Sequence, residues 1–327
     1  MFAGYHPGAP STLRPQALTA GDRVALIAPA SPFDRERFER GAKALQAIGL
    51  EPAFGEGIYS KHPEQDPYLA GTDERRLSEL RSALQDPAVR MITLARGGYG
   101  LMRLLHAPNP LELGELVTAQ KLLLGYSDAT VLHELWARAG LPSIHGPMCT
   151  QLGEDVPALE RLRELVQGKD PGPVRWEPRA PIESTLVRTG TAEGVLRGGN
   201  LAMLAALCGT PLMPQFSGCI VLLEDLNEPP YRLDRLVTQL LLAGVLRGAR
   251  AVVVGDLVGA GEPSKGRAEA VAERLSTLNI PLAFGAPFGH AGRNEPVAFG
   301  CRHALDVAQG TLTPLESPVS VRTAQNA

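Results

Sequence analysis

A serine stands where an aliphatic run turns into a helical pattern, in the stretch LLLGYSDATVLHEL at 122–135. A serine hydroxyl becomes a useful nucleophile when it is exposed, paired with a base and placed beside backbone N–H groups that can hold an oxyanion. A sharp strand-to-helix turn exposes Ser127 and directs the N–H of Asp128 to the same space. Gly125 and Ala129 let the strand and helix approach closely, so the stretch approaches the G-x-S-x-G pattern, with alanine for the last glycine. Serine is also a favoured helix N-cap, so without a base and an acid this turn predicts no more than a helix start.

A serine nucleophile needs a base, usually histidine, and an acid that orients it. His145 follows an aliphatic run in SIHGPM, at the edge of a parallel sheet where sites commonly form, and His290 lies where a β pattern breaks into a glycine-rich loop. Glu224 and Asp225 end the hydrophobic run CIVLLED, where a charged group is costly unless it is paired or used. The residues alone leave open which histidine and which carboxylate act.

The elements that must carry these side chains follow from alternating aliphatic and helical patterns. Strands that are buried on both faces and alternate with helices predict a doubly wound parallel sheet in an α/β domain. Thr72 is expected to cap one helix and Gly140 to end another. In this first half, strands are expected within 23–31, 50–55, 89–100, 121–128 and 141–147, and helices within 35–49, 72–86 and 128–140.

The second half mixes strand and helix patterns. Residues 154–190 are rich in Pro, Glu and Arg and contain one helical pattern, followed by a stretch typical of a crossing between lobes. Strands are then expected at 219–226 and 249–257, helices at 231–248 and 267–278, and mostly β structure to about 315. We therefore predict an N-terminal α/β domain at 1–160, a linker at 161–188, a C-terminal mixed α/β domain at 189–315 and a flexible tail at 316–327.

Composition excludes several classes of protein. The 327 residues are 44% hydrophobic and 20% charged, as in an ordinary globular protein, and the net charge of −3 without a basic run predicts no nucleic-acid partner. No apolar stretch approaches the ~18 residues that span a bilayer, and the first residues lack a signal-peptide pattern, so we expect a cytoplasmic protein with no membrane partner. Four isolated cysteines are expected to be reduced core residues: Cys149, Cys208, Cys219 and Cys301. No metal site or other cofactor is predicted, because no ligand spacing is present.

Six short motifs occur in order along the chain: RGGYG at 96–100, GYSDAT at 125–130, HGPM at 145–148, GGNLAML at 198–204, LLEDLNEPPYRLDR at 222–235 and FGH at 288–290. Together they resemble the LD-carboxypeptidase family of serine peptidases, which also contains the microcin C resistance peptidases. The similarity covers about residues 20 to 315, and six ordered motifs are far more specific than any one of them.

The resemblance implies a Ser-Glu-His triad at Ser127, Glu224 and His290. Ser127 would attack a carbonyl, His290 would take and return the proton, and Glu224 would orient the imidazole and stabilise its cation. It is this resemblance that selects His290 over His145, while Asp225 remains the rival to Glu224 on the residues alone.

The resemblance also implies an oxyanion hole and a substrate. The backbone N–H of Asp128 and that of Gly98 or its neighbour Gly97 would hold the oxyanion. The substrate would be a murein tetrapeptide, cut at the L,D-peptide bond to its terminal D-alanine during cell-wall recycling, by a homodimer without a cofactor. A terminal carboxylate suits the bidentate fork of arginine, and we nominate Arg96 and Arg232, which lie beside motif residues.

Two alternatives remain. Microcin C-type relatives act on aminoacyl- or peptidyl-nucleotides and, by the resemblance, carry a longer loop between the Glu and His motifs with an aromatic residue; here residues 257–279 form a short connection without one, which favours the murein peptide. The other alternative is a non-enzymatic, two-lobed ligand-binding protein in which RGGYG holds phosphate and Ser127 only caps a helix.

Overall fold

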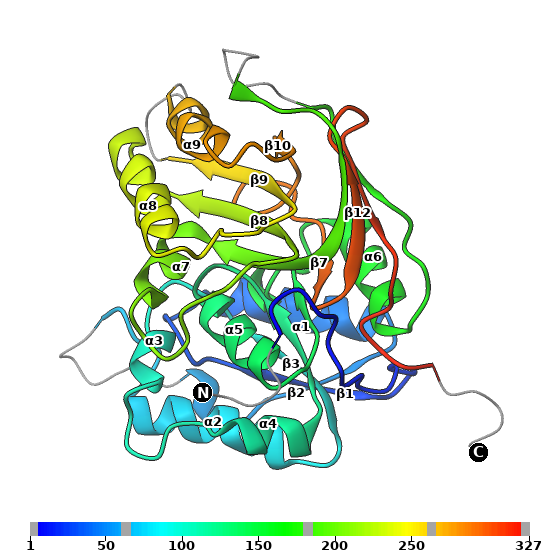
Figure 1. Cartoon of the computed structure of the whole chain (residues 1–327). Helices are drawn as coiled ribbons and strands as arrows, with labels where there is room; N and C mark the ends of the chain where they lie inside the picture. Colours follow the sequence, from blue (N-terminus) through cyan, green and yellow to red (C-terminus); the bar gives the residue numbers. More distant parts are fainter. Residues whose placement is uncertain (1–5, 60–66, 179–185, 260–265, 322–327) are drawn as a thin grey trace.

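The computed structural model describes residues 6–59, 67–178, 186–259 and 266–321. Its strands form a six-stranded and a seven-stranded sheet, drawn one below the other in Figure 1. The first sheet carries the turn with Ser127, and the second carries Glu224. The arrangement of these two sheets therefore determines whether the candidate nucleophile and the candidate acid can meet.

The first sheet has the strand order β11-β5-β4-β3-β1-β2. Five of its strands run parallel, and β11 is antiparallel to β5. Aliphatic runs form these strands because both faces of the sheet are covered. The strands are β1 (Arg23–Ile27), β2 (Glu51–Ala53), β3 (Val89–Leu94), β4 (Leu122–Gly125), β5 (Ser143–His145) and β11 (Val297–Phe299).

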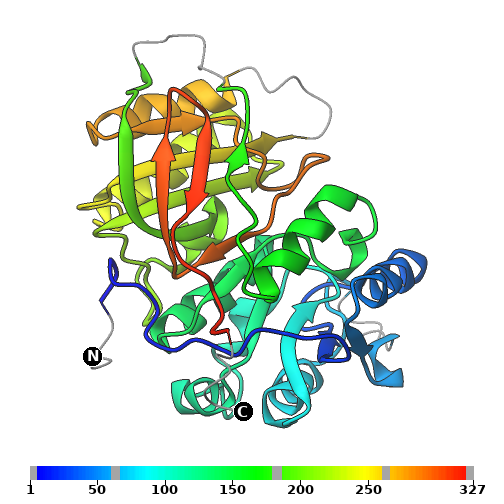
Figure 2. The same ribbon diagram turned by 90° about the vertical axis from the view of Figure 1, so that its right-hand side faces the viewer.

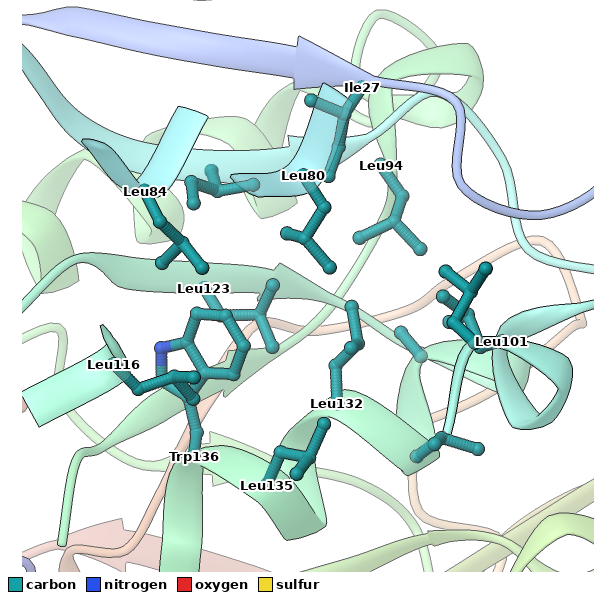
Figure 3. Close-up of a cluster of buried hydrophobic side chains, with 14 of the residues drawn as sticks. Ile27, Leu80, Leu84, Leu94, Leu101, Leu116, Leu123, Leu132, Leu135 and Trp136 are labelled. Carbon is teal, nitrogen blue, oxygen red and sulfur yellow. The ribbon is translucent and has the colours of Figure 1, made fainter. Parts of the chain in front are cut away.

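Helices pack on both faces of the first sheet. On one face Leu80, Leu123 and Trp136 belong to a single buried cluster, drawn in Figure 3. On the other face Phe38 and Leu162 pack against Leu124 in a second cluster. The first face is covered by α2 (Asp73–Gln85), α3 (Leu101–Leu104), α4 (Leu113–Ala119) and α5 (Thr130–Arg138), and the second by α1 (Arg35–Ala47) and α6 (Val156–Val166).

The second sheet has the order β10-β9-β8-β7-β12-β13-β6. Its strands β7 to β10 are parallel, and β12, β13 and β6 pair antiparallel. Three helices cover one face: α7 (Leu201–Leu207), α8 (Pro230–Leu242) and α9 (Arg267–Ser276). The strands are β6 (Val174–Arg175), β7 (Thr191–Asn200), β8 (Cys219–Leu226), β9 (Ala251–Val258), β10 (Leu282–Phe284), β12 (Arg302–Asp306) and β13 (Thr311–Pro314).

The predicted fold class is confirmed: a doubly wound parallel sheet is followed by mixed α/β structure. The Thr72 hydroxyl accepts the Arg75 N–H at 3.2 Å and so caps α2, as expected. Helix α5 ends at Arg138, and Gly140 follows with a φ of +72°, the left-handed conformation that favours glycine after a helix. The short helices α3 and α4 were not predicted, because one or two turns carry too little hydrophobic periodicity to be recognised.

The chain crosses between the sheets more than once. Strand β6 lies within the predicted linker at 161–188 and pairs with β13, and β11 returns from the C-terminal half to the first sheet. In the predicted tail, Val319 is buried and Ser320 forms a bridge with Gln16. Parts of the predicted linker, of the 257–279 connection and of the tail lie outside the described residues, at 179–185, 260–265 and 322–327. The division into domains stays a prediction.

An N-terminal segment runs across both halves beside the end of the chain (Figure 2). The Cys219 thiol donates to the Pro7 carbonyl near the second sheet, and the Leu13 N–H donates to the Gly140 carbonyl near the first. All four cysteines are free thiols, and all but the half-buried Cys208 are buried, as expected. None of the helices in the described ranges combines the length and apolarity needed to cross a bilayer.

Candidate active site

The turn after β4 holds Ser127 in an unusual backbone conformation. Its φ is +62°, in the left-handed region that residues with a Cβ rarely enter, at a cost on the order of 1–3 kcal/mol. A Cβ on Gly125 would lie 2.8 Å from the Cβ of Ala129, so glycine is required where the strand and helix meet. The close approach expected from the sequence is confirmed, and this turn is more strained than a helix cap requires.

The glycine loop that follows β3 runs directly beside this serine. A Cβ built on Gly97 would lie 3.2 Å from the Cβ and 3.3 Å from the Oγ of Ser127. Gly98 has a φ of +106°, and a Cβ there would lie 2.5 Å from the Oγ of Ser31, which accepts the Tyr99 N–H at 3.0 Å. The loop therefore brings backbone, unobstructed by side chains, to the Ser127 hydroxyl.

Buried charged groups hold the glycine loop in place. The carboxylate of Asp128 accepts the Leu101 N–H at 2.9 Å. The buried Arg76 guanidinium donates to the carbonyl of Gly100 at 3.0 Å and also to that of Pro29. Burial raises the pKa of Asp128 to about 6, although the Leu101 N–H and the charge of Arg76 oppose this shift. The residue after Ser127 thus ties the two segments that surround the hydroxyl.

The second sheet contributes a paired carboxylate and imidazole. Nδ1 of His290, in the loop after β10, lies 2.7 Å from Oε2 of Glu224, near the end of β8. Glu224 is fully buried, and a Cβ on Gly289 would lie 3.0 Å from its Oε2, so glycine permits this approach. Burial alone lowers the pKa of His290, but the hydrogen bond and charge of Glu224, with the nearby Asp225 and Asp256 carboxyls, raise it above 6.5.

A pocket of about 380 Å³ brings residues of both sheets together. Ser127 and His290 both line it, as do Gly97, Gly98 and Arg96, which the sequence also singled out. The His290 ring also packs on Tyr126, with 4.8 Å between ring centroids. The remaining lining residues are Asp34, Arg37, Met148, Thr150, Gln151 and Leu226.

The rival candidates lie elsewhere. His145 is fully buried among aromatic rings, its pKa is lowered by burial, and neither ring nitrogen has a hydrogen-bond partner among the described residues. Asp225 accepts the Ala202 N–H at 2.8 Å and the Leu226 N–H at 2.7 Å. Neither His145 nor Asp225 is among the described residues that line the pocket. The geometry therefore favours His290 and Glu224.

The two nominated arginines have different surroundings. Arg96 lines the pocket and donates to the Pro32 carbonyl at 3.0 Å. Arg232, on α8, pairs at 2.8 Å with Glu228, which precedes that helix, and Arg232 is not among the described residues that line the pocket. Arg37, at the start of α1, does line it, and sequence reasoning missed it. The signal was available, because the loop after β1 ends at the same edge of the parallel sheet as the turn after β4.

This set of groups can perform nucleophilic chemistry. A hydroxyl and an imidazole share one pocket, the imidazole is held by a carboxylate, and a strand-to-helix turn and a glycine loop surround the hydroxyl. Across the described ranges, three or more His, Cys, Asp or Glu side chains never gather as a metal-ligand cluster.

Comparison with known proteins agrees with this chemistry. Residues 24–146 match the LD-carboxypeptidase N-terminal domain, and residues 193–305 match the LD-carboxypeptidase C-terminal domain. The chain is 33% identical to the murein tetrapeptide carboxypeptidase of Pseudomonas aeruginosa, over 87% of this chain and 93% of that protein. It is 25% identical to the microcin C7 self-immunity protein of Escherichia coli, over 93% and 96% of the two chains.

A solved structure also shows similarity to this family. The crystal structure of muramoyltetrapeptide carboxypeptidase from Oxalobacter formigenes superposes with a TM-score of 0.74 at 30% identity, over 89% of this chain and 97% of that one. The family expected from the six motifs is thereby confirmed. The chain belongs to the LD-carboxypeptidase family and is a serine-type carboxypeptidase.

Proposed function

We propose that this enzyme hydrolyses the L,D-peptide bond to the terminal D-alanine of murein tetrapeptides, through a Ser127-His290-Glu224 triad and an acyl-enzyme. The observation that carries the proposal is the His290 imidazole, which is bonded to a buried carboxylate and lines one pocket with Ser127. The similarity to the murein tetrapeptide carboxypeptidase of Pseudomonas aeruginosa supports the choice of substrate.

In this mechanism each group has one task. Glu224 accepts a hydrogen bond from Nδ1–H of His290, which leaves Nε2 free to take the proton of the Ser127 hydroxyl as its oxygen attacks the carbonyl carbon. His290 then returns the proton to the departing D-alanine amine. A water molecule, activated by the same imidazole, hydrolyses the ester and restores Ser127. The charge of Glu224 stabilises the imidazolium formed in each half-reaction.

The oxyanion is held by backbone N–H groups of Asp128 and of Gly98 or Gly97. A second N–H beside the nucleophile is supported by the glycine loop, which packs on Ser127 without an intervening Cβ. One such donor contributes about 10²- to 10³-fold in rate, because it is already oriented in a site that excludes water. The Asp128 carboxylate and Arg76 support this geometry by fixing the loop.

The terminal carboxylate of the substrate needs a cationic partner in the pocket. We assign this role to Arg96 together with Arg37, because both guanidinium groups belong to residues that line the pocket with Ser127. Arg37 pairs with Glu154 at 2.8 Å, and this half-exposed pair can open for a ligand at little cost. Arg232, which pairs with Glu228 and does not line the pocket, is a weaker candidate.

The direct experiment is mass spectrometry of murein tri-, tetra- and pentapeptides incubated with the enzyme and with Ser127→Ala. We expect the tetrapeptide to lose one alanine in the presence of the native enzyme, and Ser127→Ala to lower kcat by about 10³-fold or more with substrate binding largely kept. Undiminished release of D-alanine by the variant would refute the triad. The ligand-binding alternative predicts instead that neither protein releases D-alanine and that serine-directed acylating reagents do not react.

A microcin C-type activity is the second candidate, because the similarity to the microcin C7 self-immunity protein of Escherichia coli extends over 93% of this chain. The connection at 257–279 has no aromatic side chain to stack on a nucleobase, and the identity to the murein enzyme is higher. Both points favour the murein peptide. Comparing kcat/KM for a murein tetrapeptide and a peptidyl-adenylate separates the two activities. The setting in cell-wall recycling and the homodimer rest on the family resemblance alone, and the cytoplasmic location rests on the sequence pattern of the chain.

A further inference from the structure

The helix that follows Ser127 is joined to the second sheet by four buried residues. Thr130 and Glu134 are one turn apart on α5, and Arg197 and Asn200 lie near the end of β7. We refer to these four residues as the α5–β7 latch. The mechanism above uses none of them, although two carry charges that are costly to bury.

Two short contacts make up the latch. Oγ1 of Thr130 accepts the N–H of Asn200 at 2.9 Å, and the same hydroxyl donates to the carbonyl of Ser127 at 2.7 Å. Nη2 of Arg197 lies 2.6 Å from Oε2 of Glu134, with side-chain exposures of 4% and 1%. The backbone of Ser127 is therefore linked to β7 through a single side-chain oxygen.

The far end of the latch reaches the strand that holds the acid. In the parallel pairing of β7 with β8, Asn200 is the register partner of Glu224. A Cβ on Gly199 would lie 2.5 Å from Oγ1 of Thr130, and the φ of Gly199 is +135°, so glycine is needed for β7 to approach α5 this closely. The contact thus joins the strand next to Glu224 to the turn that carries Ser127.

The chemistry explains why such a contact matters. Ser127 follows a strand of the first sheet, whereas the His290–Glu224 pair belongs to the second. Proton transfer requires the hydroxyl and the imidazole nitrogen to come within about 2.6–3.2 Å. A buried ion pair contributes little net stability compared with apolar residues of the same shape. The presence of Glu134 and Arg197 is therefore better explained if they fix one arrangement of the two sheets than if they only stabilise the fold.

We propose that the α5–β7 latch sets the relative position of the Ser127 hydroxyl and the His290 imidazole, and that Thr130 is its main positioning residue. This inference rests on the proposed triad. Thr130 acts through the backbone of Ser127 and does not touch the substrate. Loss of its hydroxyl leaves the pocket lining unchanged but releases the turn from β7, so the effect is expected in the chemical step.

The test is Thr130→Val, which keeps the shape and removes the hydroxyl, with Thr130→Ser as the conservative variant that restores it. Thr93→Val is the matched control, because Thr93 is equally buried in β3 and its hydroxyl has no hydrogen-bond partner among the described residues. We expect Thr130→Val to lower kcat by roughly 10- to 100-fold with KM nearly unchanged, because a displacement of the reacting groups by about 1 Å can reduce the rate of the chemical step by up to about 100-fold. Thr130→Ser should recover most of the loss, and Thr93→Val should match the native enzyme.

A double-mutant cycle separates positioning from a general structural role. If Thr130 acts by positioning Ser127 relative to His290, Thr130→Val should lower kcat only slightly once His290 is replaced by alanine. Additive losses in Thr130→Val/His290→Ala would overturn the inference. A small fluorophosphonate forms a phosphonyl ester with the Ser127 oxygen and releases fluoride, and the rate of this reaction should fall in parallel with kcat. An undisturbed rate of phosphonylation would also overturn the inference.

Assays well below the measured unfolding midpoint exclude unfolded protein as the cause. If Thr130→Val does not fold, Glu134→Gln tests the second contact of the latch and should give the same split between kcat and KM. The two proposals fail in different ways. Native-like release of D-alanine by Ser127→Ala or His290→Ala refutes the triad, whereas inactive triad variants with a fully active Thr130→Val refute the latch alone.

Discussion

The carboxyl of Asp128 offers a test of the site that does not depend on turnover. Its pKa is raised from an ordinary 3.8 to about 6, chiefly by burial between the serine turn and the glycine loop. A group whose pKa is raised by folding favours the native state below its unfolded pKa, and that contribution is lost as the pH rises through the folded value. Ionisation of Asp128 therefore destabilises the native protein at neutral pH.

The magnitude follows from the shift. With a difference of about two pKa units, ionisation of Asp128 lowers the free energy of unfolding of the native protein by about 3 kcal/mol above pH ~7 and by almost nothing below pH ~3. In Asp128→Asn the amide oxygen can still accept the Leu101 N–H, but nothing ionises. The variant should therefore gain stability relative to the native protein as the pH rises from about 4 to 8.

The assay is urea unfolding of both proteins across this pH range, with the free energy of unfolding plotted against pH. Asp225, whose pKa is raised to about 7, bends the curve of both proteins in the same direction, so the difference between the two curves isolates Asp128. Two curves that remain parallel would mean that Asp128 ionises equally readily in the folded and unfolded protein, which would contradict its burial between the serine turn and the glycine loop.

Two further predictions concern the reaction. Glu224→Gln removes the charge that raises the pKa of His290, so the acid limb of the pH profile of kcat/KM should move to lower pH. The maximal rate should fall by about 10²- to 10⁴-fold. A pH–rate profile with an unmoved acid limb would contradict the pairing of Glu224 with His290. Arg96→Met should lower kcat/KM about 10- to 100-fold for a tetrapeptide with a free carboxylate and far less for its C-terminal amide, because a charge-assisted hydrogen bond is lost. Equal losses on both peptides, measured by mass spectrometry, would show that Arg96 does not bind the carboxylate.

Local features of this chain were predictable from sequence. The Thr72 cap, the serine turn and the alternation of buried strands with helices depend on neighbouring residues, and the structure confirms them. Six ordered motifs also identified the family correctly. The choice of His290 over His145 required the family resemblance, because the difference in burial between the two side chains depends on how both sheets pack around them.

Long-range contacts were not predictable. A parallel sheet places Arg37 at the same edge as the Ser127 turn, but whether the two share a pocket depends on the order of the strands, which the sequence does not determine. The contacts of Thr130 with Asn200 and of Glu134 with Arg197 join residues more than 60 positions apart. Each partner alone looks like an ordinary helix or strand residue.

The return of β11 to the edge of the first sheet has a consequence for biosynthesis. During translation, β5 emerges from the ribosome well over a hundred residues before β11, its antiparallel neighbour. Until then the nascent N-terminal half presents an unpaired strand edge, the kind of surface on which other chains can associate. Completion of the first sheet is thus delayed until the His290 loop has been made, so the first sheet and the pocket that Ser127 and His290 line are completed together.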